Sequence, residues 1–195
     1  MPGQTSPVDQ LAQLLDAAQR LIAGVRADQW TASTPCTEWN VRDLVNHLVR
    51  GNRLFAAAVR GEQPPIPPPG TPPPVTDVLG DDPVGAYRAS ADALLDAFGR
   101  PGVMERAVTV PFGNVPGAVA LHLRNTELLV HGWDLARATG QSPDFPEAAA
   151  QQELEFSRRS ISQIPPGRTP FGPSQPVADD APALDRLAAL LGRQV

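Results

Sequence analysis

The chain has 195 residues, a formal net charge of −5 and 5% aromatic residues, and all 16 of its cationic residues are Arg. This length suits one domain with its own core, and we expect a single domain over residues 1–195. The acidic balance, without any basic cluster, argues against a nucleic-acid-binding surface. Because there is only one cysteine, Cys36, no internal disulfide can form.

Neither a signal peptide nor a membrane span is expected from the sequence. The first ten residues lack a basic region followed by an apolar run. No apolar stretch approaches the roughly 20 residues that are needed to cross a bilayer. We therefore expect a cytoplasmic protein that does not bind membranes.

Helical spacing of apolar residues predicts two amphipathic helices in the first sixty residues. The first covers residues 9–25. The second begins at Asn40, a good N-cap residue that forms an approximate capping box with Asp43, and runs to about Val59. His47 lies beside the apolar stripe of this second helix, so we expect it to be partly buried. A lone His in such a place is more often a core residue with one hydrogen bond than a ligand.

The middle of the chain contains a proline-rich stretch, a helix and one strand-like run. Residues 61–74 are rich in Pro and predict a stiff, polyproline-like surface connection. Asp82 followed by Pro83 predicts the start of a helix that ends near Gly99. Residues 106–112 resemble a β-strand, which we expect to be an extended connector or part of a small hairpin.

Three further helices are predicted in the second half of the chain. One is a long helix that Gly140 ends, and the next follows Pro146 and covers residues 147–164. A loop rich in Pro and Gly, residues 165–176, leads to a last helix over residues 181–191. With five or six helices and little strand signal, the predicted fold class is all-α.

The long helix before Gly140 carries three polar groups on one narrow face. At 100° per residue, Glu127 and His131 lie about 40° apart, and Asp134 lies about 20° from Glu127. His122 falls about 180° from His131, so it is predicted to face away. A buried stripe of acidic and imidazole groups is costly unless the groups are paired or bound to a metal.

This face predicts half of a metal site. E-x-x-x-H on a helix places a carboxylate and an imidazole one turn apart, so that both reach one cation. Catalytic zinc sites use three protein ligands and leave one position open, and two His with one Glu is a known set. Non-haem iron accepts the same ligands. His47 is the remaining inward-facing His, so His47, Glu127 and His131 are the predicted metal ligands.

Asp134 and Cys36 each allow more than one interpretation. Asp134 could accept a hydrogen bond from a ligating His, replace Glu127 as a ligand, or form an ordinary ion pair with Arg137. Cys36 could be a nucleophile, but a free Cys is more often a small buried hydrophobic residue. We interpret Trp39, close to Cys36 in the sequence, as a packing residue.

Two long motifs carry a resemblance to a known family. TPCTEWNVRDLVNHLV (34–49) and ELLVHGWDLARATGQ (127–141) resemble actinobacterial proteins that share the N-terminal domain of mycothiol-dependent maleylpyruvate isomerase, within the DinB-like superfamily. DDAPALDRLAALLGR (179–193) is similar to the tail of a stand-alone metal-binding subgroup. The resemblance implies a DinB-like four-helix bundle, here with one or two extra short helices, that holds a divalent metal, usually zinc.

The resemblance also implies a ligand set and a chemistry. The family's His, followed by Glu and His spaced E-x-x-x-H, maps onto His47, Glu127 and His131. In the isomerase, mycothiol binds at the metal and adds to a double bond of the substrate, and zinc promotes this by deprotonating the coordinated thiol. The isomerase also has a C-terminal domain that completes its active site, which we do not expect here.

Three functions are therefore expected as alternatives. The first is a thiol-dependent transferase or isomerase that acts on a small electrophile, with mycothiol as cosubstrate. The second is a metal- or thiol-sensing binding module without turnover. The third is a structural bundle with a neutralised polar core. Some DinB-like bundles pair through helix faces, so a homodimer is one option for the assembly.

Overall fold

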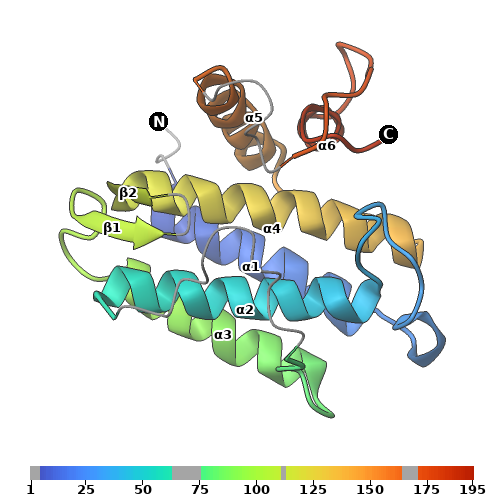
Figure 1. Cartoon of the computed structure of the whole chain (residues 1–195), viewed down its shortest axis with the longest axis horizontal. Coiled ribbons are helices and arrows are strands. Elements are labelled where there is room, and N and C mark those ends of the chain that lie inside the picture. The colour runs from blue at the N-terminus through green and yellow to red at the C-terminus, as the bar shows by residue number, and fades with distance from the viewer. Residues whose placement is uncertain (1–4, 63–75, 111–112, 164–170) are drawn as a thin grey trace.

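Six α-helices and one small β-hairpin make up the described part of the chain. The computed structural model describes residues 5–62, 76–110, 113–163 and 171–195. The described residues confirm the predicted all-α class. In chain order the elements are α1 (Pro7–Ala23), the 3₁₀ helix η1 (Ala27–Gln29), α2 (Val41–Arg60), α3 (Pro83–Phe98), β1 (Ala107–Val110), β2 (Gly113–Pro116), α4 (Gly117–Thr139), α5 (Glu147–Ile161) and α6 (Ala183–Leu190). Figure 1 labels the α-helices and the two strands.

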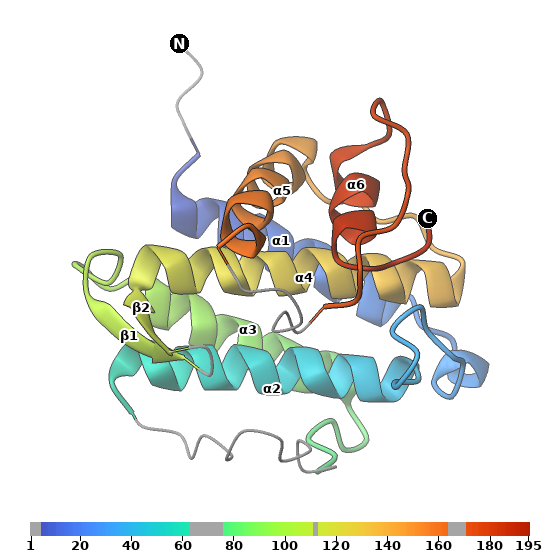
Figure 2. The same ribbon diagram turned by 45° about the horizontal axis from the view of Figure 1, so that its top comes forward.

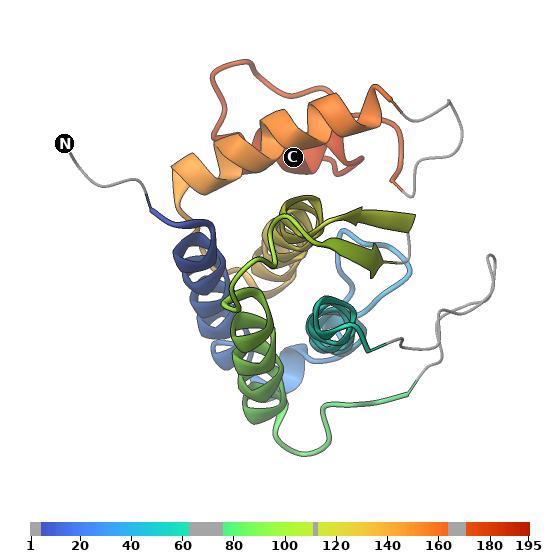
Figure 3. The ribbon, with the colours of Figure 1, turned by 90° about the vertical axis from the view of Figure 1, so that its left-hand side faces the viewer.

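Helices α1 to α4 form a four-helix bundle. Each packs against two neighbours, in the spatial order α1, α3, α2, α4, and Figure 3 shows this ring nearly end-on. The core between them is built mainly from Leu, Val and Ala, as the low aromatic content predicts. Helices α5 and α6 pack on each other and on α4, so they cover the outer side of that helix (Figure 2). Because of this cover, α4 is buried on almost all sides.

Local capping signals set where the helices begin and end. Asn40 and Asp43 form the predicted capping box, with Asp43 N donating to Asn40 Oδ1 at 2.9 Å. The first helix starts two residues earlier than predicted, because Ser6 Oγ accepts from the Asp9 backbone N–H at 3.1 Å. Gly140 ends α4 as predicted, in the left-handed conformation with φ of 68°.

The strand-like run forms a two-stranded hairpin, one of the two forms expected for it. Strands β1 and β2 pair antiparallel, with Ala107 opposite Pro116 and Val110 opposite Gly113. Two strands alone are marginally stable in water, so burial must support them. Val108 and Val110 provide it, since each is 1% exposed and β1 packs on α2 and α4.

The C-terminal segment is attached to α4 and α5 by side-chain hydrogen bonds. Glu147 Oε1 accepts from the Ala183 backbone N–H at 2.8 Å, which serves the first turn of α6. Trp133 Nε1 donates to Asp185 Oδ1 at 2.7 Å, linking α4 to α6. Helix α5 ends at Ile161, three residues before the predicted end, and α6 is three residues shorter than predicted.

Some predictions fall on residues that the structure does not describe. In the proline-rich stretch these are residues 63–74, and in the second predicted loop they are residues 165–170. Within the described ranges, no helix combines the length and the apolar character that a bilayer span requires.

Candidate metal centre

The predicted ligands come together where α2 packs on α4. His47 projects from α2, while Glu127 and His131 lie one turn apart on α4. The Nε2 atom of His47 is 3.7 Å from Glu127 Oε2, and the ring centroids of His47 and His131 are 4.8 Å apart. The structure therefore brings all three predicted ligands into one cluster.

The His47 side chain has a free ligand atom at this cluster. Its Nε2 is buried and has no hydrogen-bond partner among the described residues. The 3.7 Å separation from Glu127 is too long for a hydrogen bond. Two ligands about 2.1 Å from a tetrahedral zinc lie about 3.4 Å apart, so the observed separation is close to that of two groups sharing a cation. An unpartnered buried nitrogen is costly in a protein, and a metal would satisfy it.

Asp134 determines which nitrogen of His131 remains free. His131 Nδ1 lies 3.1 Å from Asp134 Oδ2. Burial would raise the pKa of this carboxyl, but hydrogen bonds from His131 and Arg193 outweigh burial and lower it. An ionised carboxylate only accepts, so Nδ1 of His131 must donate. Because burial also lowers the pKa of His131, the neutral ring keeps a lone pair on Nε2.

The geometry excludes one of the three roles considered for Asp134. Its contact with His131 is that of a carboxylate that accepts from an imidazole N–H, as the first role requires. The alternative ion pair with Arg137 is wrong, because the Arg137 guanidinium lies 4.8 Å over the Trp133 ring and 4.0 Å from Asp185. Asp134 pairs instead with Arg193, 59 positions away, through contacts of 2.9 and 3.2 Å.

Arg124 is a buried cation beside the cluster that was not anticipated from the sequence. Its side chain is 0% exposed, and Nη1 donates to Glu127 Oε2 at 2.6 Å. The guanidinium also donates to Asn52 Oδ1 and to the Leu48 carbonyl, each at 3.0 Å. A Cβ on Gly51 would lie 2.3 Å from Nη1, so only Gly leaves room for the guanidinium here. The i,i+3 spacing of Arg124 and Glu127 is the signal that could have found this pair.

These neighbours determine the charge of the Glu127 carboxyl. Burial would raise its pKa, but the imidazole of His47 and the guanidinium of Arg124 outweigh burial and hold it below its ordinary value. Glu127 is therefore an ionised carboxylate at neutral pH. With Arg124 beside Glu127 and Arg193 beside Asp134, each carboxylate of the cluster has its own guanidinium.

Trp39 covers the two imidazoles from the segment between η1 and α2. Its ring centroid lies 4.4 Å from that of His47 and 5.6 Å from that of His131. Thr34 holds this segment in place, because its hydroxyl lies 2.8 Å from the Trp39 carbonyl and 3.0 Å from the Cys36 carbonyl. Trp39 is thus a packing residue, as predicted, and at the same time a wall of the cluster.

Cys36 belongs to a second group of candidate ligands. Its Sγ, a ring nitrogen of His131 and a carboxylate oxygen of Asp134 all lie within 4.8 Å of one another. Burial raises the pKa of the Cys36 thiol, which disfavours the thiolate in the absence of a cation. We call Cys36, His131 and Asp134 the cysteine set, and His47, Glu127 and His131 the open set. The two sets share His131.

His122 lies outside both sets, as its place on the helix predicts. Its Nδ1 is 2.9 and 3.0 Å from the two carboxylate oxygens of Glu153 on α5, and its ring stacks on Phe156 at 4.6 Å. Glu153 is fully buried and also accepts from Asn125 Nδ2 at 3.1 Å. This second pair of imidazole and carboxylate joins α4 to α5.

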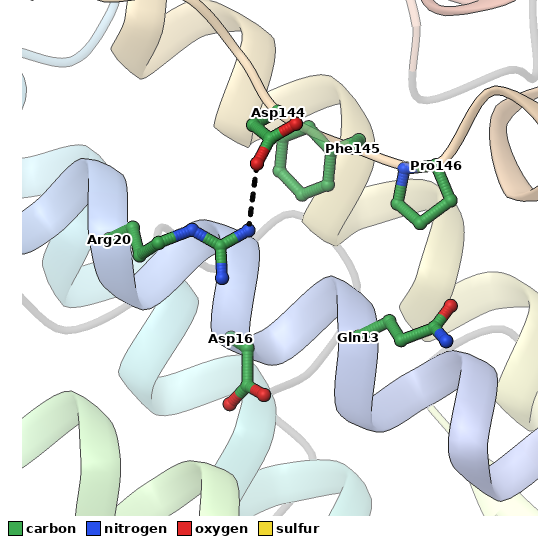
Figure 4. A pocket seen from close by; sticks show the side chains of 6 residues that line it. All are labelled: Gln13, Asp16, Arg20, Asp144, Phe145 and Pro146. Atoms are coloured by element: carbon green, nitrogen blue, oxygen red, sulfur yellow. Dashed lines mark hydrogen bonds and ion pairs between the residues drawn. The ribbon is translucent and has the colours of Figure 1, made fainter.

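A hollow on the outer surface contains no member of either set. It has a volume of about 260 Å³ and lies between α1 and residues 144–146, with Gln13, Asp16 and Phe145 in its wall (Figure 4). Arg20 and Asp144 meet across it at 3.3 Å, and their side chains are 60% and 90% exposed. An exposed ion pair of this kind contributes little to binding or stability.

Comparison with known proteins relates this arrangement to a family. Two uncharacterized proteins, from two strains of Mycobacterium tuberculosis, are each 40% identical over 182 residues, which covers 92% of this chain and 93% of theirs. Crystal structures of the mycothiol-dependent maleylpyruvate isomerase and of a mutant of it have the same fold. Their TM-scores are 0.60 and 0.61 at 18% and 16% identity, and the match covers 80% of this chain and 70% of theirs. Residues 11–136 match the family described as Mycothiol maleylpyruvate isomerase N-terminal domain, and the chain belongs to that family.

Proposed function

We propose that the open set binds a divalent metal and that the protein uses it to activate a low-molecular-weight thiol toward a small electrophile. The observation that carries this proposal is the buried, unpartnered Nε2 of His47 beside the Glu127 carboxylate. Two imidazoles and one carboxylate are a known zinc set that leaves one coordination position for another ligand. Mycothiol is the thiol that the family's description suggests.

The residues around the open set fit this role. The Asp134 carboxylate holds the His131 ring with Nδ1 as donor, which leaves the lone pair on Nε2 free for a metal. Arg124 engages Oε2 of Glu127 at 2.6 Å and so restricts the orientation of the carboxylate. Trp39 packs against both imidazole rings and so restricts their movement. When bound, the metal would lower the pKa of a coordinated thiol and supply a thiolate near neutral pH.

The proposed reaction class is a thiol-dependent transfer or isomerisation. The thiolate would attack an electrophilic carbon, as in addition to an activated double bond. The electrophile is the part of the proposal that depends on the family, since the residues of the cluster do not select one substrate.

Metal content is the first test, and the chain offers a matched control. We expect the purified protein to bind about one zinc ion, and His47→Ala and His131→Ala to bind it at least about 100-fold more weakly. His122→Ala removes the remaining His, which faces α5, and is expected to keep full zinc affinity. A metal-free wild type after supply of zinc, or a His131→Ala variant with unchanged affinity, contradicts the proposal.

Turnover separates this function from a binding module without catalysis. The specific observation that favours the module is the cysteine set. The Cys36 Sγ lies within 4.8 Å of a ring nitrogen of His131, so it could occupy the coordination position that a substrate thiol would need. A panel of electrophiles with mycothiol should show zinc-dependent consumption of the thiol if the protein is an enzyme. Stabilisation by zinc or thiol without any consumption would support the module instead.

A further inference from the structure

The segment that follows α6 reaches the candidate metal centre through one side chain, Arg193. Its Nε donates to Asp134 Oδ1 at 3.2 Å, and its Nη2 donates to Oδ2 at 2.9 Å. The third nitrogen, Nη1, donates to the Leu191 carbonyl at 2.9 Å, which fixes the plane of the guanidinium. The Arg193 side chain is 10% exposed and that of Asp134 is 0% exposed. This is a two-point pairing of guanidinium and carboxylate that fixes orientation as well as charge.

The pairing commits Asp134 to a single role. Its Oδ2 contacts both Arg193 and His131 Nδ1, while Oδ1 contacts Arg193 alone. If Asp134 were to coordinate a cation without losing a contact, it would have to use the remaining lone pair of Oδ1, next to Arg193. The cation would also lie beside the guanidinium, and like charges at such short range repel. Asp134 in this arrangement acts as an acceptor for His131 and is a poor ligand.

The cysteine set is the alternative metal site that the pairing of Arg193 with Asp134 disfavours. Thiolate, imidazole and carboxylate are all groups that zinc accepts, and their ligand atoms here lie within 4.8 Å of one another. Since both sets include His131, a metal bound by the cysteine set would compete with Arg193 and His131 for the Asp134 carboxylate. Whether Asp134 stays paired with Arg193 therefore decides which set can bind a metal.

We propose that Arg193 is a positioning residue that selects the open set by holding Asp134 against His131. This inference rests on the proposed function, because it assumes that the open set binds metal. Arg193 lies outside the segment that matches the family, residues 11–136. The selection of ligands is thus built into a part of the chain beyond the matched domain.

The first experiment needs no metal. With ¹⁵N-labelled His in metal-free protein, the nitrogen shifts should show His131 with Nδ1 protonated and Nε2 bare in the wild type. Arg193→Gln should give a mixture of the two ring tautomers. Arg193→Lys keeps the charge but cannot make the two-point contact of the guanidinium, so it should give an intermediate result. Arg186→Gln, on α6 and paired with Gln151, is the matched control and should match the wild type. Identical His131 shifts in wild type and Arg193→Gln would overturn the proposal.

The second experiment uses cobalt(II) as the probe, because a cysteine thiolate bound to cobalt gives a strong near-ultraviolet charge-transfer band. Wild type should bind cobalt without this band. Arg193→Gln should bind about tenfold or more weakly through the open set and should gain the band. The band should disappear again in the double variant with Cys36→Ser. A thiolate band already present in the wild type, or no band in Arg193→Gln, counts against the proposed selection.

The two experiments separate failure of this inference from failure of the proposed function. If the wild type binds no cobalt but its His131 tautomer depends on Arg193, the positioning role holds and the proposed metal function fails. If cobalt binds to the wild type and its spectrum is the same in Arg193→Gln, the metal function holds and the role of Arg193 fails. Circular dichroism of each variant checks that the helices remain folded.

Discussion

Helix α4 carries two imidazole–carboxylate clusters on opposite sides, and they differ in whether the imidazole and the carboxylate are hydrogen-bonded to each other. On the side that faces α5, both oxygens of Glu153 contact the His122 ring nitrogen at 2.9 and 3.0 Å. On the side that faces α2, His47 Nε2 is buried without a hydrogen bond, 3.7 Å from Glu127. The same residue types therefore form a closed pair on one side and leave a ligand atom unused on the other.

Their countercharges differ as well. Each carboxylate of the α2 side has a guanidinium, Arg124 for Glu127 and Arg193 for Asp134. Among the residues that the structure describes, Glu153 contacts only the His122 ring and neutral amide and hydroxyl groups. Fixed guanidinium partners keep a carboxylate ionised and oriented, which suits a site that must hold a cation in addition. The α5 side is thus arranged for packing, while the α2 side keeps the features that the proposed metal binding requires.

Removing the buried guanidinium should have the largest effect. Arg124→Met leaves the partly buried Glu127 carboxylate without its guanidinium, and the Leu48 carbonyl and Asn52 Oδ1 without this donor, so we expect the free energy of unfolding of the metal-free protein to fall by about 3 kcal/mol. Zinc should restore a part of this loss, since it brings positive charge back to Glu127. Denaturant melts with and without zinc measure both effects. Arg88→Met, at an exposed position of α3, is the control, and a metal-free stability equal to that of the wild type would contradict the assigned role.

Variants of the His122–Glu153 cluster should change the stability of the protein but not its zinc binding. His122→Ala removes the main donor to the buried Glu153 carboxylate, which should cost about 1–3 kcal/mol, while the stabilisation by zinc stays that of the wild type. Adding Glu153→Leu should recover a part of the cost, because no buried carboxylate is then left without its imidazole, while Asn125 Nδ2 loses its acceptor. Thermal melts of both variants with and without zinc test this. A loss of zinc-dependent stabilisation in His122→Ala would remove the distinction between the two sides.

The smallest effect is expected at the buried Tyr87 on α3, and it should depend on pH. Burial raises the pKa of Tyr87 above its ordinary value of 10.0, and its hydroxyl donates to the Leu15 carbonyl at 3.4 Å. The folded chain therefore keeps this proton where the unfolded chain loses it. The resulting stability is complete below about pH 10 and decreases as the pH rises further.

Tyr87→Phe tests that dependence. The substitution should cost about 1 kcal/mol near neutral pH and should flatten the fall in stability above about pH 10. Urea unfolding at several pH values measures the slope, and the absorbance of this single tyrosine reports its titration directly. An unchanged alkaline slope in Tyr87→Phe would mean that other groups cause the decrease.

Local signals along the chain determined the helices and half of the cluster. The Asn40 and Asp43 capping box and the Gly140 end follow from contacts within a few residues, so the sequence contains the necessary information. The shared face of Glu127, His131 and Asp134, and the opposite direction of His122, follow from helix periodicity alone. The strand pairing was harder to predict, because β2 has little strand propensity and is held by β1 and by packing.

Only the tertiary structure decided which distant groups complete the cluster. Trp39, Cys36 and Arg193 reach His131 or Asp134 from other segments, and no spacing in the sequence relates them to α4. The buried Arg124 depends on the missing side chain of Gly51 on the facing helix. Whether a polar atom finds a partner depends on neighbours brought close by folding. For that reason the sequence indicated the ligand types, while the fold determined that His122 is paired and His47 keeps a free nitrogen.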